Sequence, residues 1–133
     1  MSPNKIVAQM LQNDFFSKWL GIKVIKVTAG YCKLKCKVKK DTLNGFGIAH
    51  GGFTYSIADS ALAFASNSNG IKSLSVETSI SHVKKIKEND LVIVEAKLLN
   101  ENSKFGYYEA KLTCKKEIIT LFKGTVFKTE NKW

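Results

Sequence analysis

The stretch LNGFGIAHGGFTYSIADSALAFASNS, residues 43–68, decides how this chain folds. Its second half, Gly51 to Asn67, predicts a helix that is apolar almost all round, and such a helix lies inside a protein. One aspartate, Asp59, interrupts the apolar run near its middle. Because a carboxylate buried without a partner costs free energy, we expect Asp59 either to be hydrogen-bonded or to face a cavity.

The loop before this helix, residues 41–50, is rich in glycine and ends in His50, Gly51 and Gly52. Glycine allows positive φ and lets a ligand approach the backbone closely. The start of a helix also offers unpaired N–H groups to an anion or a developing oxyanion. A glycine-rich turn that only packs tightly has the same composition, so the loop by itself leaves binding and structural roles open.

Alternating apolar and polar residues predict strands on both sides of the helix. The expected strands cover residues 22–28, 30–39, 72–84, 91–99, 105–116 and 118–128. In residues 72–84 we expect Leu74, Val76, Thr78 and Ile80 to share one face. Short polar turns separate the last four strands, as in antiparallel hairpins. Helical segments are expected at residues 3–13 and near residues 15–21.

These elements predict an α+β fold in which an antiparallel sheet of five to six strands curls around one long central helix. The length, 133 residues, suits a single domain over residues 1–133, with residues 1–20 as an N-terminal helical segment. No apolar run is long enough to span a membrane, and the first residues lack the apolar core of a signal peptide. We therefore expect a cytoplasmic protein.

The formal net charge is +10, and every basic residue is a lysine. Many lysines alternate with apolar residues, as in CKLKCKVKK (residues 32–40), which is the pattern of a solvated sheet face. Without arginine, bidentate recognition of guanine or phosphate is absent, which disfavours a nucleic-acid partner. Cys32, Cys36 and Cys114 are expected to be reduced thiols, because their spacing fits neither a disulfide within one strand nor a zinc site.

A lone acid and backbone donors at a helix start point to hydrolysis by general-base or nucleophilic catalysis. Gly51 and Asp59 are eight residues apart, which is about 12 Å along a helix at ~1.5 Å per residue. The carbon and oxygen of one carbonyl group cannot easily meet both groups of one chain. The simplest solution is a two-fold dimer in which one chain supplies the donor and the other supplies the acid.

The pattern Asn-Gly, His-Gly-Gly, Ala-Asp and Ala-x-Asn-Ser resembles the signature of hotdog-fold acyl-CoA thioesterases. Within these it is most similar to the thioesterases of phenylacetic acid degradation, and LFKGTVFK (residues 121–128) resembles their last strand. The resemblance covers about residues 20–129. It implies hydrolysis of an acyl-CoA such as phenylacetyl-CoA to the free acid and coenzyme A, no separate cofactor, and dimers that pair into homotetramers.

The resemblance also implies roles for individual residues. Asp59 is the nucleophile or general base, and Gly51 offers its N–H to the thioester oxygen. Asn44 positions the water or the thioester, Ser75 helps to hold the water, and His50 shapes the loop. The remaining expected contacts with the substrate or its coenzyme A come from Gly52, Ser60, Lys84, Lys85 and Lys87.

The chain departs from the family where HVKKIKENDL (residues 82–91) replaces a Leu-Arg-Pro segment and a Gly-Asp turn. Asn89 stands where glycine is usual, and asparagine tolerates left-handed φ. Lys84, Lys85 and Lys87 can replace the arginine as point charges for phosphates, or they are simply solvated. Two rival functions stay open: a hotdog hydratase or dehydratase, which needs a histidine base such as His50, and a non-catalytic module that binds acyl-CoA or nucleic acid.

Overall fold

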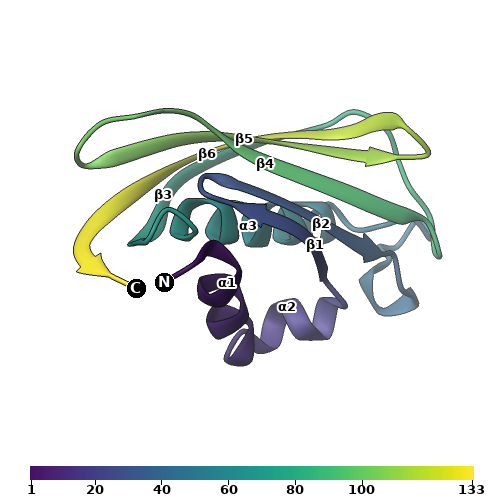
Figure 1. The fold of residues 1–133 in the computed structure, drawn as a ribbon. Helices are drawn as coiled ribbons and strands as arrows, with labels where there is room; N and C mark the ends of the chain where they lie inside the picture. The colour runs from purple at the N-terminus through teal and green to yellow at the C-terminus, as the bar shows by residue number, and fades with distance from the viewer.

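The computed structural model describes residues 1–133 as one sheet wrapped along a central helix (Figure 1). The helices are α1 (Pro3–Gln12), α2 (Phe15–Leu20) and α3 (Gly51–Asn67), with a 3-10 turn at Lys40–Thr42. The strands are β1 (Lys23–Thr28), β2 (Tyr31–Lys37), β3 (Ile71–His82), β4 (Leu91–Glu101), β5 (Phe105–Cys114) and β6 (Glu117–Lys132). All the expected helices and strands are present, and β6 runs farther than the sequence predicts. None of the helices combines the length and apolar character needed to cross a membrane.

The strands form one six-stranded sheet in the order β1-β2-β4-β5-β6-β3, and every neighbouring pair is antiparallel. In Figure 1 the sheet arches over α3, and α1 and α2 lie below. This is the hotdog fold that the sequence predicts. The two edges of the sheet are β1 and β3, so β3, which follows α3 directly, presents one unpaired side.

The helix α3 occupies the centre because its apolar side chains pack against the concave face of the sheet. Ile57, Ala61 and Phe64 are fully buried, and the core cluster also contains the inward-facing residues of β2 and β5. The expected alternation on β2 is confirmed: Cys32 and Cys36 are buried thiols and free of disulfides, while the lysines between them point outward.

The helix packs tightly against β6 at Gly124. A Cβ atom placed on Gly124 would lie 2.4 Å from a methyl carbon of Leu62, whose side chain is 1% exposed. Because a Cβ atom at this distance overlaps the Leu62 methyl group, any larger residue at this point of β6 would force the Leu62 side chain to move. The sheet can therefore lie directly against the middle of α3, close to Asp59.

The predicted shared face of Leu74, Val76, Thr78 and Ile80 is wrong. A bulge between Ser75 and Glu77 breaks the register of β3 against β6, and an extra residue reverses which side chains point inward. Ile80 pairs with Phe122 on the core side, whereas Leu74 pairs with the part-exposed Phe127. Leu74 and Val76 are 67% and 59% exposed on the open edge strand.

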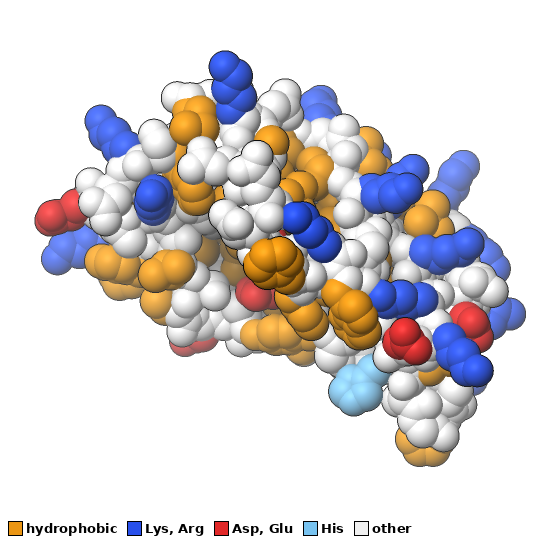
Figure 2. Space-filling view, turned by 90° about the horizontal axis from the view of Figure 1, so that it is seen from below, with side chains coloured by type: hydrophobic (Ala, Val, Ile, Leu, Met, Phe, Trp, Pro, Cys, Tyr) orange, Lys and Arg blue, Asp and Glu red, His pale blue; other side chains and the backbone are white.

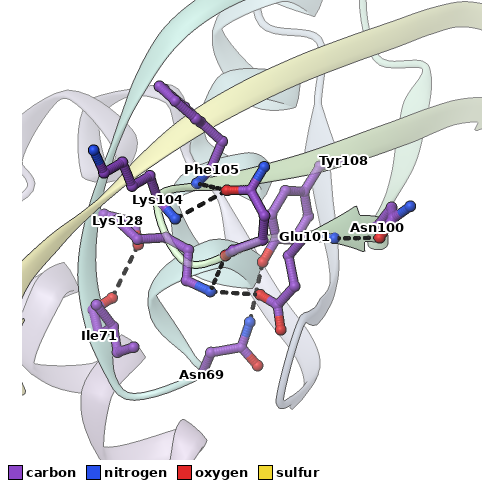
Figure 3. Close-up of polar contacts among 10 residues, drawn as sticks. Asn69, Ile71, Asn100, Glu101, Lys104, Phe105, Tyr108 and Lys128 are labelled. Carbon is purple, nitrogen blue, oxygen red and sulfur yellow. Dashed lines mark hydrogen bonds and ion pairs between the residues drawn. The ribbon is translucent and has the colours of Figure 1, made fainter.

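A cluster of polar side chains ties the far end of the β4–β5 hairpin to β6 and to Asn69, the second residue after α3 (Figure 3). The Lys128 ammonium donates to Glu101 at 3.1 Å and to the Asn102 carbonyl oxygen at 2.9 Å. The Asn69 amide donates to the Tyr108 hydroxyl at 3.1 Å. Burial, and then the charge of Glu101, raises the pKa of Tyr108 to about 12, so the phenol stays protonated. This cluster fixes the hairpin against β6.

Candidate active site

Asp59 lies on α3 with its side chain partly exposed, and its carboxylate has neither a hydrogen-bond partner nor an ion pair in the chain. It lines a cavity of about 500 Å³, here called the acid cavity. The apolar part of its wall comes from Met10, Leu62, Ala63, Leu74, Val126 and Trp133. Burial raises the pKa of the Asp59 carboxyl above its ordinary value. The carboxylate is thus a stronger base than a solvated one, and both its oxygens are free.

Ser75 lines the same acid cavity from β3. It pairs with the buried Val126 of β6, so its side chain lies on the inner face of the sheet just before the bulge. The structure therefore brings Asp59 and Ser75 to one cavity.

The start of α3 is held by His50. The His50 Nδ1 atom accepts a hydrogen bond from the Gly52 N–H at 2.7 Å, which is an N-cap made by a histidine. The Gly52 N–H is therefore already used, and Gly52 serves the cap. Gly51, the first helical residue, has no acceptor one turn back in the helix, so its N–H is free for a ligand.

Asn44 holds the loop before α3. Its Oδ1 accepts from the backbone N–H groups of Phe46 and Ile48 at 2.9 and 3.3 Å, and its own N–H donates to the Ile48 carbonyl oxygen at 2.7 Å. The Asn44 Nδ2 group has no partner in the chain and is free to donate. Asn44 and Gly51 line a second cavity of about 270 Å³, here called the loop cavity.

His82 also lines the loop cavity, although the sequence analysis did not select it. A Cβ atom on Gly51 would lie 3.2 Å from His82 Nε2, so the imidazole stands beside the helix start. The Thr54 hydroxyl donates to the Gly51 carbonyl oxygen at 3.1 Å and lies 3.4 Å from His82 Nδ1. This arrangement favours a proton on Nδ1 and leaves Nε2 as an acceptor. The sequence feature that could have identified His82 is its position two residues after Ile80, which faces inward.

The three selected lysines line a third cavity, the lysine pocket, of about 480 Å³, which adjoins the loop cavity. Lys84 forms an ion pair with Glu117, which raises the pKa of Lys84 and lowers that of Glu117. Lys85 and Lys87 have no acidic partner. The turn after them contains Asn89 at φ 72°, so the expected left-handed conformation is confirmed.

Ser60, next to Asp59, lies away from these cavities. Its hydroxyl is 2.8 Å from that of Ser17, which in turn donates to Asp14 at 2.7 Å. Asp14 also caps α2 by accepting from the Ser17 N–H at 2.9 Å. Ser60 therefore joins α3 to α2 in this structure.

The selected residues thus fall into two groups within one chain. Asp59 and Ser75 line the acid cavity, whereas Asn44, Gly51, Lys84 and Lys85 line the loop cavity. The groups lie on opposite parts of α3, whose observed span keeps Gly51 and Asp59 about 12 Å apart along the axis. One chain provides an acid in an apolar cavity and, separately, a set of donors flanked by lysines.

Comparison with known proteins shows the family to which this chain belongs. The model of the thioesterase superfamily matches residues 46–120. The chain is 38% identical over 121 residues to a putative esterase of Archaeoglobus fulgidus, covering 90% of this chain and 78% of that protein. It is 28% identical to the acyl-coenzyme A thioesterase PaaI of Escherichia coli, covering 86% of this chain and 83% of that protein.

The fold agrees with these relatives. The solved structure of the E. coli PaaI protein from the phenylacetic acid degradation operon superposes with a TM-score of 0.95 at 25% identity, covering 98% of this chain and 95% of that one. Fold and site together define a hotdog thioester hydrolase. The chain belongs to the thioesterase superfamily.

Proposed function

We propose that this enzyme hydrolyses acyl-CoA thioesters, with Asp59 as the general base or the nucleophile. The observation that carries the proposal is the free Asp59 carboxylate in an apolar cavity on the central helix of a thioesterase-superfamily fold. An unpartnered acid there has no structural purpose, and its raised pKa suits proton abstraction better than that of a solvated aspartate.

In the proposed reaction the Gly51 N–H and the free Asn44 amide donate to the thioester oxygen and stabilise the oxyanion as it forms. Asp59 takes a proton from water, which attacks the carbonyl carbon, or attacks that carbon itself to give an anhydride that water then opens. The carbon–sulfur bond breaks, and coenzyme A leaves as the thiolate. Ser75 helps to hold the water, and His50 keeps the loop in place through its cap.

We propose that each complete site is shared by two copies of the chain. The separation of the acid and loop cavities supports this, because one carbonyl group cannot reach both in one chain. The unpaired side of β3, with Leu74 and Val76 exposed, offers an edge that a second copy can cover. From the family likeness we extend the assembly to a pair of dimers, a homotetramer, and place the enzyme in the cytoplasm.

We assign the coenzyme A phosphates to the lysine pocket and the acyl group to the acid cavity. Charge supports this division, because the lysine pocket contains the unpaired cations Lys85 and Lys87, whereas the one lysine of the acid cavity, Lys72, lies over the Trp133 ring. A phenylacetyl group is our proposed acyl group, on the likeness to PaaI. Because the lysines are exposed, we expect KM to rise with salt concentration, as screening acts over about 8–10 Å.

Asp59→Asn tests the catalytic assignment. A general base contributes roughly 10²–10⁴-fold, so we expect kcat to fall by that factor while KM changes little. The measurement is release of free thiol from a panel of acyl-CoA esters, including phenylacetyl-CoA. Asn44→Ala removes only a positioning group, so it should lower kcat by a smaller factor than Asp59→Asn. Turnover of Asp59→Asn within a few-fold of the parent would disprove the assignment.

The same assay separates the two rival functions. A hydratase or dehydratase would convert an enoyl-CoA without releasing thiol, and a binding module would hold acyl-CoA unchanged. The His50 Nδ1 atom, which a histidine base would need free, is engaged in the helix cap. We therefore place hydrolysis first.

A further inference from the structure

Trp133 follows β6 and is firmly held against the end of α3. Its indole N–H donates to Asn67 Oδ1 at 2.9 Å, and its backbone N–H donates to the Gly70 carbonyl oxygen at 3.0 Å. The Lys72 ammonium lies 5.0 Å from the centre of the ring, which is a cation–π distance. Three separate interactions thus fix the ring.

The partner of the indole, Asn67, is itself immobile because it is 3% exposed and uses its whole amide. Its Nδ2 donates to the carbonyl oxygens of Ala63 and Ser73 at 2.9 and 3.1 Å. Its Oδ1 accepts from the Ser73 N–H at 2.9 Å as well as from Trp133. All four hydrogen-bonding positions of the side chain are therefore occupied.

This anchoring places the ring on the same cavity as the catalytic acid. Asp59, Ala63 and Asn67 succeed one another at intervals of four residues, so they lie along one face of α3. Asn67 is eight residues beyond Asp59, about 12 Å along the helix. Asp59 and Trp133 both line the acid cavity, and its volume of about 500 Å³ lies in the usual range of ligand sites, roughly 300–1,000 Å³.

We propose that Trp133 is a specificity-determining residue that limits the length of the acyl group. The inference rests on the proposed function, in which the thioester carbonyl lies at Asp59. An acyl group attached there extends along the apolar side of α3, past Leu62 and Ala63, and its far end meets the indole ring. Short aliphatic and phenylacetyl groups fit in front of the ring, whereas long chains run into it.

The first experiment compares kcat/KM for phenylacetyl-CoA, hexanoyl-CoA and palmitoyl-CoA. In Trp133→Ala we expect the ratio for palmitoyl-CoA over hexanoyl-CoA to rise about tenfold or more, since even one methylene is worth 10–200-fold in such a pocket. Trp133→Phe keeps a ring in place and should keep the preference of the parent. Trp19→Ala is the matched control, because Trp19 is 49% exposed on α2 and does not line the cavity. An unchanged ratio in Trp133→Ala overturns the proposal.

Thermal melts followed by circular dichroism check that the variants fold, and Trp133→Leu replaces Trp133→Ala if the latter does not. Leucine retains apolar packing but is shorter than the indole. It should therefore also raise the ratio, by less than alanine, and an unchanged ratio in a folded Trp133→Leu likewise overturns the proposal.

The second experiment does not depend on turnover. The chain has two tryptophans, so Trp19→Phe leaves Trp133 as the one indole reporter. Combined with Asp59→Asn, it allows fluorescence titration with hexanoyl-CoA, phenylacetyl-CoA and coenzyme A alone. We expect the two acyl-CoA esters to change the Trp133 emission and coenzyme A alone to leave it unchanged. If all three ligands bind with no acyl-dependent change, Trp133 does not contact the acyl group, whatever the role of Asp59.

Discussion

At the scale of single residues, burial makes the Asp59 carboxylate more basic and, when the carboxylate is ionised, lowers the stability of the folded chain. Burial raises its pKa in the folded chain above the ordinary value of the unfolded chain, about 3.9. A carboxyl with a raised folded-state pKa contributes stability when protonated, and that contribution is lost as the pH rises through the folded pKa. An enzyme that works with Asp59 ionised therefore holds an uncompensated charge at a half-buried position on the wall of the acid cavity.

This argument predicts the stability of Asp59→Asn. The amide carries no charge, so the variant should melt at a higher temperature than the parent at pH 7, and the difference should shrink as the pH falls towards 4. Thermal melts at a series of pH values provide the measurement. Asp41→Asn, at an exposed site, should show no such trend. A variant that melts at or below the parent at neutral pH would show that the carboxylate is compensated in the assembled protein.

At the scale of elements, the contact between α3 and β6 depends on Gly124. Gly124→Ala places a methyl group against Leu62, and overpacking of this kind costs about 1–3 kcal/mol of unfolding free energy. Leu62→Ala alone leaves a cavity and should cost about 2–5 kcal/mol. The double variant should be less destabilised than the sum, because the shortened side chain makes room for the new methyl group.

Denaturant unfolding of the four proteins measures this coupling. Gly45→Ala is the control, since a Cβ atom there meets nothing within 4 Å and should leave stability nearly unchanged. Strict additivity of Gly124→Ala and Leu62→Ala would mean that the helix and strand do not touch as described.

At the scale of the whole molecule, the surface combines free cations with apolar side chains that no part of the chain covers. Figure 2 shows apolar side chains gathered among lysines on the face that carries the helices. Leu74 and Val76 add an apolar edge on β3. The proposed shared site requires that association through such a surface bring the acid cavity of one chain to the loop cavity of the other.

Mixing two impaired variants tests the shared site. Asp59→Asn disables both sites of a dimer and Asn44→Ala weakens both, but a hybrid dimer has one intact site, with Asp59 from one chain and Asn44 from the other. After unfolding and refolding an equal mixture, activity should recover to about a quarter of the parent, as random pairing in a two-fold dimer predicts. Light scattering should give at least twice the chain mass of 14.8 kDa. An active monomer, or a mixture no better than its components, would contradict the shared site.

Local pattern was enough to predict most of the elements. The helix from Gly51 to Asn67 and the alternation around Cys32 and Cys36 follow from periodicity, since a side chain's face depends only on its position along a regular element. The candidate acid also followed from local chemistry, because Asp59 is the one charged residue within an apolar helix. Its position in an acid cavity with Ser75 agrees with that reading.

Local sequence pattern did not predict the features that depend on an irregular strand or on contacts between distant segments. The bulge in β3 reverses the face of Leu74, and no local signal in the sequence marks it, because the register is set by pairing with β6. The contact of Ser60 with Ser17 could not be predicted, because the two residues are 43 positions apart in the chain. His82 and Trp133 escaped selection for the same reason: their partners Thr54 and Asn67 are neighbours only after folding.

By itself, then, the sequence determined the elements, the buried helix and the acid within it, because these depend on residue type and short-range periodicity. Only the tertiary structure decided the neighbours of that acid: the opening of the acid cavity, the free carboxylate, the separate loop cavity and the Trp133 ring beyond them. The physical reason is that hydrogen bonds and packing between segments far apart in the chain depend on how the sheet curls around the helix. Spacing along the chain does not specify that curvature.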